Sequence, residues 1–258
     1  MNACTLCSER LCAKVLKMSK YLIAGHVIKI KGELSEIKDS LSDYAYTGKK
    51  SAEREFTMSK KQFDRAARGF VNEYRTEIEN YFFALEFSGW LAKNDGMYLH
   101  SAAVMYKGFG YMFTAPSGSG KSTHANLWRQ AFGYDEVTFI NDDKPLIVRE
   151  NGGFFVCGAP WHGKENEQRN VKAPLRAICV IEKAKENSIT RLEAADALNI
   201  LLSQSVIPRG RKSFASFADM LDDLLSRVPV FKLRCNISED AARLAYSAMS
   251  EQQTGFGR

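Results

Sequence analysis

Hydrophobic positions along the first third of the chain change from a strand pattern to a helical one. The aliphatic and β-branched run Tyr21–Ile30 predicts a strand, whereas the polar residues 31–60 predict edge strands and loops. From about Lys60 to Leu91 the apolar positions follow helical spacing, and Asn94-Asp95-Gly96 provides turn residues that end the helix. This part is therefore expected to form a small α/β layer.

The rest of the chain alternates strand and helix signals. Two strands, Tyr98–Tyr106 and Gly110–Ala115, flank a tight break at Lys107-Gly108. Later strands are expected at Glu136–Ile140, Leu146–Glu150, Phe154–Cys157, Leu175–Ile181 and Pro229–Leu233. Helices are expected up to about Phe132, over Glu193–Ser203 and Ser213–Ser226, and after a cap at Ser238. The pattern predicts a mixed α/β fold without internal repeats.

A glycine-rich loop, Ala115–Thr123 (APSGSGKST), joins an apolar strand to a helix. It fits the P-loop pattern except that alanine replaces the first glycine. Gly118 and Gly120 allow the backbone N–H groups to turn towards phosphate oxygens, Lys121 adds a positive charge, and Ser122 offers a hydroxyl to Mg²⁺. The expected nucleotide-binding residues of this loop are Ser117, Gly118, Ser119, Gly120, Lys121, Ser122 and Thr123. ATP and Mg²⁺ are therefore the expected ligands.

Two adjacent carboxylates, Asp142 and Asp143, directly follow the short strand EVTFI. Next to a bound metal, one carboxylate can stay ionised towards Mg²⁺ while the other accepts a proton from the acceptor hydroxyl. A solvated turn before Pro145 is the alternative, and the glycine-rich loop favours the functional interpretation.

Two basic loops are less specific. Trp161-His162-Gly163-Lys164, with Arg169 and Asn170 behind it, could clamp a phosphate or an acidic substrate, and could equally be a solvated loop. Arg209, Arg211 and Lys212 form a second basic cluster that we interpret as surface.

Composition changes this picture little. The 258 residues carry a formal charge of +6, which suits an anionic ligand or an ordinary solvated surface. Six cysteines indicate a reducing compartment, and Cys4, Cys7 and Cys12 are expected to lie in a loose N-terminal tail. Neither a targeting signal nor a membrane-spanning run is evident, so we expect a cytoplasmic protein. The expected divisions are a tail or upstream mis-start over 1–17, an α/β layer over 18–95, and a core over 96–258.

Taken together, these motifs resemble the HPr kinase/phosphorylase family, especially its smaller HPr-kinase-like and serine-kinase-like relatives. The resemblance runs from about Tyr98 to Ile181 through LHSAAV, APSGSGKST, INDDKPLI and GAPWHGK, and continues in VPVFKLRCN. That family shares its P-loop core with ATP-dependent phosphoenolpyruvate carboxykinase. The resemblance implies an α/β fold in which helices flank a mixed central sheet, next to the small N-terminal layer.

The resemblance also implies roles for individual residues. Lys121 and Ser122 would hold phosphates and Mg²⁺, Asp142 would be the acid/base carboxylate, and Asp143 would support the metal. His100 matches a histidine that precedes the loop in the family, although a lone strand histidine is more often structural. Lys164 lies about where related enzymes bring basic groups to the phosphates.

The predicted function is therefore an ATP-dependent kinase that acts on a hydroxyl acceptor, such as a serine-type hydroxyl of a peptide, protein or small molecule. Two alternatives stay open: a nucleotide sensor without transfer, and a phosphatase or phosphorylase that runs the same site in reverse. The signature stretch and N-terminal domain of the bacterial regulators have no counterpart in this chain, so the resemblance does not extend to HPr as substrate. Neither nucleic acid nor a membrane is expected as a partner, and a homo-oligomer stays open.

Overall fold

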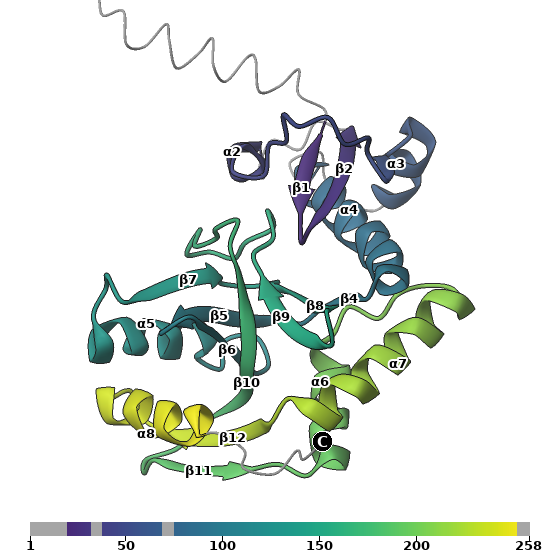
Figure 1. Ribbon diagram of the computed structural model, residues 1–258. Coiled ribbons are helices and arrows are strands. Elements are labelled where there is room, and N and C mark those ends of the chain that lie inside the picture. The colour runs from purple at the N-terminus through teal and green to yellow at the C-terminus, as the bar shows by residue number, and fades with distance from the viewer. Residues whose placement is uncertain (1–19, 32–37, 69–74, 252–258) are drawn as a thin grey trace, which may run out of the picture. The chain divides into compact units, whose positions relative to one another are not determined.

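The computed structural model describes residues 20–31, 38–68 and 75–251 (Figure 1). The chain divides into two compact units after Phe87, inside its longest N-terminal helix. Cys4, Cys7, Cys12 and the expected 1–17 tail lie outside the described residues. Within those residues, the helices are too short or too polar to cross a membrane.

The first unit contains a three-stranded sheet with the order β1-β2-β3. Strand β2 pairs antiparallel with β1 and parallel with β3. The elements are β1 (Tyr21–Ile23), β2 (His26–Lys31), α2 (Lys38–Ser42), β3 (Arg54–Thr57), α3 (Lys60–Ala66) and α4 (Arg75–Leu91). The mixed α/β character predicted for this region is present.

Two predictions for this unit need correction. The expected strand Tyr21–Ile30 is a hairpin, because Ala24 and Gly25 have φ of 51° and 86° and turn the chain back on itself. Positive φ at both central residues is the geometry of a tight hairpin turn. The helical pattern from Lys60 to Leu91 forms two helices, α3 and α4, instead of one.

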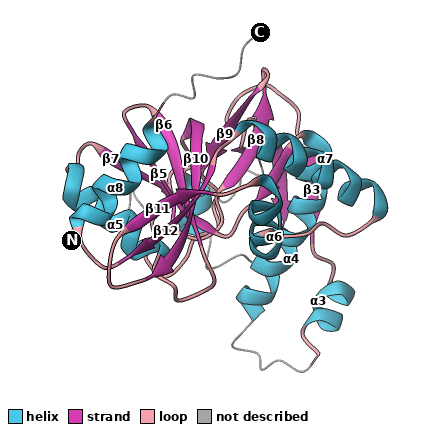
Figure 2. Cartoon of the chain, turned by 90° about the horizontal axis from the view of Figure 1, so that it is seen from below, coloured by secondary structure: helices cyan, strands magenta, loops and turns pink. Residues whose placement is uncertain are grey.

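The second unit is a curled, mixed sheet flanked by helices (Figures 1 and 2). Among its described residues the sheet has nine strands: β4-β8-β9-β10-β6-β5-β7 form one path, and β12 joins β10 to β11. The strands are β4 (Gly96–Tyr98), β5 (Ser101–Tyr106), β6 (Phe109–Thr114), β7 (Val137–Asn141), β8 (Leu146–Glu150), β9 (Gly153–Cys157), β10 (Lys172–Lys183), β11 (Ser188–Arg191) and β12 (Val230–Cys235). The helices are η2 (Ala92–Asn94), α5 (Lys121–Phe132), α6 (Ala194–Gln204), α7 (Arg211–Arg227) and α8 (Glu239–Ser250).

Strand β10 is the centre of the sheet. Its first residues pair with β9, Leu175–Val180 pair with β6, and Ile178–Lys183 pair with β12. Strands β6 and β12 both run parallel to β10. Strand β5 is antiparallel to both β6 and β7, so β7 points the same way as β6. The carboxyl ends of β7, β6, β10 and β12 therefore meet at one edge of the sheet.

Alternating side chains place a hydrophobic core on each face of this sheet. On β5, Ala102 and Val104 face α5 and α8, while Ala103 faces the opposite core with α6 and α7. Trp128 of α5 is fully buried against Tyr111 and the other aromatic residues of its face. Both views show α5 and α8 side by side on that face (Figures 1 and 2).

Several sequence predictions for this unit are confirmed, including α5, the cap at Ser238 and the turns at Lys107-Gly108 and Asn151-Gly152. The expected strand Tyr98–Tyr106 is interrupted, because Leu99 and His100 lie between β4 and β5. His100 therefore lies between two strands and not inside one. Strand β11 was not predicted, since SITR carries too few apolar residues to signal a strand.

Candidate functional site

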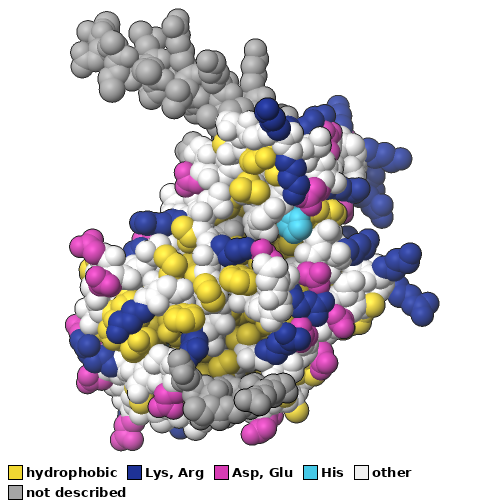
Figure 3. Space-filling model, in the orientation of Figure 1, with side chains coloured by type: hydrophobic (Ala, Val, Ile, Leu, Met, Phe, Trp, Pro, Cys, Tyr) yellow, Lys and Arg dark blue, Asp and Glu magenta, His cyan; other side chains and the backbone are white. Residues whose placement is uncertain are grey.

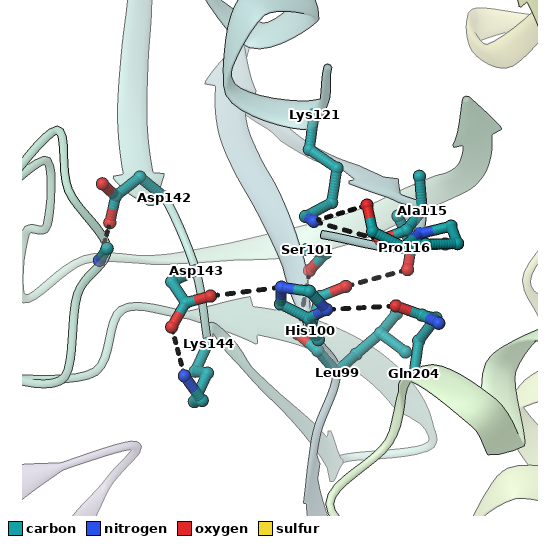
Figure 4. Close-up of polar contacts among 12 residues, drawn as sticks. Leu99, His100, Ser101, Ala115, Pro116, Lys121, Asp142, Asp143, Lys144 and Gln204 are labelled. Atoms are coloured by element: carbon teal, nitrogen blue, oxygen red, sulfur yellow. Dashed lines mark hydrogen bonds and ion pairs between the residues drawn. The ribbon is translucent and has the colours of Figure 1, made fainter. Parts of the chain in front are cut away.

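A cavity of about 580 Å³ lies at the edge where β7, β6, β10 and β12 end. It is lined by His100, residues 117–124, Leu127, Asp142, Asp143, residues 163–165, Ile181, Lys183 and residues 235–237. These segments come from distant parts of the sequence, and most of them directly follow strands that end at this edge. Figure 4 shows the polar contacts at the His100 side of this site.

The glycine-rich loop follows β6 and leads into α5. Gly118 and Gly120 have φ of 76° and 106°, a backbone region that favours glycine. A Cβ on Gly118 would meet nothing within 4 Å, so its conformation and not lack of space calls for glycine. Gly120 is the residue before the first turn of α5, whose free N–H groups and positive dipole end suit an anion.

Lys121 lies at the start of α5 and is only 7% exposed. Its Nζ donates to the Ala115 carbonyl at 3.0 Å and the Pro116 carbonyl at 3.5 Å (Figure 4). Burial lowers the pKa of Lys121, and the charge of Asp143 acts in the opposite direction. A buried ammonium group bonded only to carbonyls can gain a much stronger partner in a phosphate.

Asp142 is 3% exposed and is held by the loop that follows β9. Its Oδ1 accepts a hydrogen bond from the Gly163 N–H at 2.6 Å, and its Oδ2 accepts one from the Glu165 N–H at 3.1 Å. Burial raises the pKa of the Asp142 carboxyl, although the Gly163 bond opposes this. A carboxylate with a raised pKa is better suited to accepting a proton than an ordinary one.

Asp143 differs from its neighbour because the His100 ring and the Lys144 ammonium group lie against it. The Nε2 of His100 lies 3.3 Å from Asp143 Oδ1, and Lys144 pairs with Oδ2 (Figure 4). Burial alone would raise the pKa of Asp143, but the His100 hydrogen bond and the Lys144 charge hold it well below its usual range. Asp143 therefore stays ionised while Asp142 protonates more readily.

His100 is oriented from two sides. Its Nδ1 lies 3.0 Å from Gln204 Oε1, its backbone N–H donates to the Gln204 carbonyl at 2.8 Å, and the Thr114 hydroxyl donates to its carbonyl at 2.8 Å. Gln204 is the last residue of α6, so this helix end fixes how the His100 ring faces Asp143. The sequence carried no signal for Gln204, which is 104 residues away from His100.

Asn141 is a second residue of the site that sequence reasoning did not select. It is fully buried, and its Nδ2 donates to the carbonyls of Ala159 at 3.0 Å and Trp161 at 2.8 Å. Its Oδ1 accepts from the N–H groups of Asp143 at 2.9 Å and Lys144 at 2.7 Å. All four hydrogen-bonding positions of the amide are used, so Asn141 ties the loop after β9 to the two carboxylates.

Replacing Asn141 by Ala is expected to destabilise the fold by about 2–4 kcal/mol, because it leaves buried donors and acceptors without partners. We expect thermal denaturation to show a fall in Tm of about 5–10 °C. Asn187→Ala is the control, since the Asn187 side chain also makes two hydrogen bonds but is only half-buried. An equal loss of Tm in the two variants would contradict the role given to Asn141.

The structure brings the predicted site residues together around one cavity. Every candidate of the glycine-rich loop lines it, as do Lys164, His100 and both carboxylates. Arg169 instead bonds through its backbone to β7. Lys183, whose Nζ donates to the Gly118 carbonyl at 3.1 Å, was not predicted. Within the described residues, no group of three or more His, Cys, Asp or Glu side chains forms a metal site.

Comparison with known proteins gives a family. The model of the SynChlorMet cassette protein ScmC matches residues 87–242, more than half of the chain. The chain belongs to this family. The matched residues include the glycine-rich loop, both carboxylates and His100, so the family region contains the described cavity.

Among solved structures, the chain is similar to the HPr(Ser) kinase/phosphatase from Coxiella burnetii. The two share 10% sequence identity with a TM-score of 0.35, over 59% of this chain and 88% of that one. The similarity to this enzyme is thus weak. No curated protein matches the sequence.

Proposed function

We propose that the chain is an ATP-dependent phosphotransferase that moves the γ-phosphoryl group onto a hydroxyl acceptor. The observation that carries this proposal is one cavity with a buried lysine at the start of a helix and two unlike carboxylates. Lys121 and the loop suit phosphates, and the raised pKa of Asp142 suits a base. A module that only binds phosphate has no need of a base.

The residues of the loop fit ATP with Mg²⁺. Gly118 and Gly120 give the loop the left-handed backbone that turns N–H groups inward, and Lys121 provides the charge. Ser122 and Asp143 would hold Mg²⁺, which commonly takes one or two carboxylates plus substrate phosphates instead of an all-protein cage. When bound, the metal would neutralise charge on the phosphates.

Asp142 is proposed to accept the proton of the acceptor hydroxyl. Its hydrogen bonds to N–H groups of the loop fix the carboxylate, and the side chain lines the cavity that the acceptor would enter. His100 would position Asp143, since Gln204 holds the ring on its far side. Lys164 lines the same cavity and would meet the phosphates or the acceptor.

The sheet supports one orientation of the nucleotide. Across the edge the strand order is β12-β10-β6-β5-β7, so the glycine-rich loop lies between Ile237 on one side and Asp142 on the other. The transferred phosphoryl group belongs with the carboxylates. The nucleoside would then extend towards Ile181, Cys235 and Ile237, which form the apolar side of the cavity.

The decisive experiment is ADP formation from ATP·Mg²⁺ with a panel of hydroxyl compounds and serine-containing peptides. Acceptor-dependent ADP formation, with the phosphate found on the acceptor, supports the phosphotransferase. ATP binding without turnover for any acceptor favours the sensor, and phosphate release from phosphorylated members of the panel favours the reverse reaction. Absence of ATP binding contradicts the proposal.

The pH profile offers an independent check. Asp142 must be ionised to accept a proton, and burial raises its pKa, so activity is expected to fall on acidification before an ordinary Asp, of pKa about 3.9, would titrate. The measurement is kcat against pH, with ATP affinity followed over the same range as the control. An acid limb at or below the usual Asp range would contradict the role of Asp142.

A further inference from the structure

The segment after α6 carries three cations and two exposed apolar side chains, which we name the basic corner. It consists of Ile207, Arg209, Arg211, Lys212 and Phe214. Ile207 and Phe214 are 48% and 49% exposed, so two large apolar side chains of this segment face solvent. Figure 3 shows Lys and Arg side chains with apolar ones beside them at the right, over the end of α7 that Figure 1 draws there.

The basic corner is attached to the catalytic end of the cavity. Gln204 bonds to His100 through both its side chain and its carbonyl, and Ser205 forms an antiparallel bridge with Leu99. Arg209 follows Gln204 by five residues, so at most about 18 Å of extended chain separates them. An extended peptide of similar length can therefore reach from His100 to these cations.

The three cations of the basic corner lack neighbouring negative charges among the residues described at the start of α7. Arg211 and Lys212 begin α7, where the helix dipole is positive, and no acidic residue occupies that first turn. Within residues 75–251, none of the three cations makes an ion pair. By contrast, Arg149 on the same unit is matched by three aspartates.

We propose that the basic corner docks an extended acidic peptide segment of the acceptor, about five residues from the hydroxyl that is phosphorylated. This rests on the proposed phosphotransferase function and names the class of its acceptor. Anionic side chains would meet Arg209, Arg211 and Lys212, and an apolar side chain would cover Ile207 or Phe214. Bound anions would also relieve the repulsion between Arg211, Lys212 and the positive dipole end of α7, which strengthens binding.

Two other occupants fit these observations less well. A nucleic acid would use the cations and could stack a base on Phe214, but gives no reason for the exposed aliphatic side chain of Ile207. A second copy of this chain is disfavoured by its own charge of +6. An acidic peptide with an apolar residue satisfies both the charge and the apolar surface.

The test uses the full chain and the labelled peptide Ser-Gly-Ala-Gly-Ala-Glu-Glu-Leu, followed by fluorescence anisotropy. Wild type is expected to bind it in a salt-dependent manner and to prefer it to the same peptide with Lys-Lys-Leu. Arg211→Glu should weaken binding of the acidic peptide about tenfold and reduce the preference for it over the Lys-Lys-Leu peptide. Glu at the start of a helix is favourable, so this variant is expected to remain folded.

Lys107→Glu is the matched control, because Lys107 is an exposed cation at the opposite edge of the sheet. It should leave peptide binding unchanged. No binding by wild type, an equal effect of both variants, or equal binding of an RNA oligonucleotide would overturn the docking surface. So would dimerisation that Arg211→Glu abolishes. ATP binding is measured on the same samples: its absence refutes the phosphotransferase, whereas ATP turnover without peptide binding refutes only the docking surface.

Discussion

Asp142→Asn is expected to lower turnover by about 10²–10⁴-fold while ATP·Mg²⁺ affinity stays within about threefold. The amide has nearly the same shape but cannot take a proton from the acceptor. The NH₂ group of the asparagine cannot accept a hydrogen bond from the N–H of Gly163 or Glu165. The variant therefore also loses one of the two hydrogen bonds that hold the loop. Steady-state turnover and calorimetric ATP binding, measured side by side, separate these effects.

Gly163→Ala measures how much of the turnover lost in Asp142→Asn is due to displacement of the loop that holds Asp142. A Cβ on Gly163 would lie 3.1 Å from Asp142 Oδ2 and 3.2 Å from Asp143 Cβ, so the loop must shift while the carboxylate remains. We expect a loss of activity well below that of Asp142→Asn. If the two variants lost activity equally, Asp142 would be a loop anchor and not a base.

Lys121→Met is expected to cost about 2–5 kcal/mol of ATP binding, or roughly 30- to 5000-fold in Kd. The lysine is buried, so its charge should act on phosphates with little screening by solvent. Without ATP the variant should be as stable as wild type or more so, because methionine replaces a desolvated charge with an apolar side chain. Thermal shift with and without ATP·Mg²⁺ measures both.

Lys183→Met is the matched control for this prediction. Lys183 also bonds to the glycine-rich loop, through the Gly118 carbonyl, but its side chain is exposed. Its replacement should weaken ATP binding only a few-fold. A larger effect from Lys183 than from Lys121 would mean that the phosphates lie elsewhere in the cavity.

Local signals in the sequence were enough to predict many turns, strands and helices of the second unit. Asn151-Gly152 and Lys107-Gly108 adopt the positive φ angles that turn residues with glycine allow, and α5 starts where the glycine-rich loop predicts it. Ala24-Gly25 makes the same kind of turn without a strong signal, because alanine rarely takes positive φ. The hairpin of β1 and β2 was therefore missed.

Sequence analysis predicted the site residues that belong to short contiguous motifs and missed those that do not. Lys121 and Asp142 belong to short motifs that a sequence displays directly. Gln204 and Asn141 act through hydrogen bonds to segments that only the folded sheet brings close. Their residue types are common, so no spacing in the sequence distinguishes them from surface amides.

Strand β10 has a consequence for how the chain is made. It pairs with β6, which is synthesised more than fifty residues earlier, and with β12, which is synthesised more than forty residues later. The apolar residues of β5, β6 and β7 therefore leave the ribosome long before the strands and α8 that cover them. Such distant pairings make folding slow, so these apolar residues are expected to stay exposed on the nascent chain until β10 and β12 have been translated.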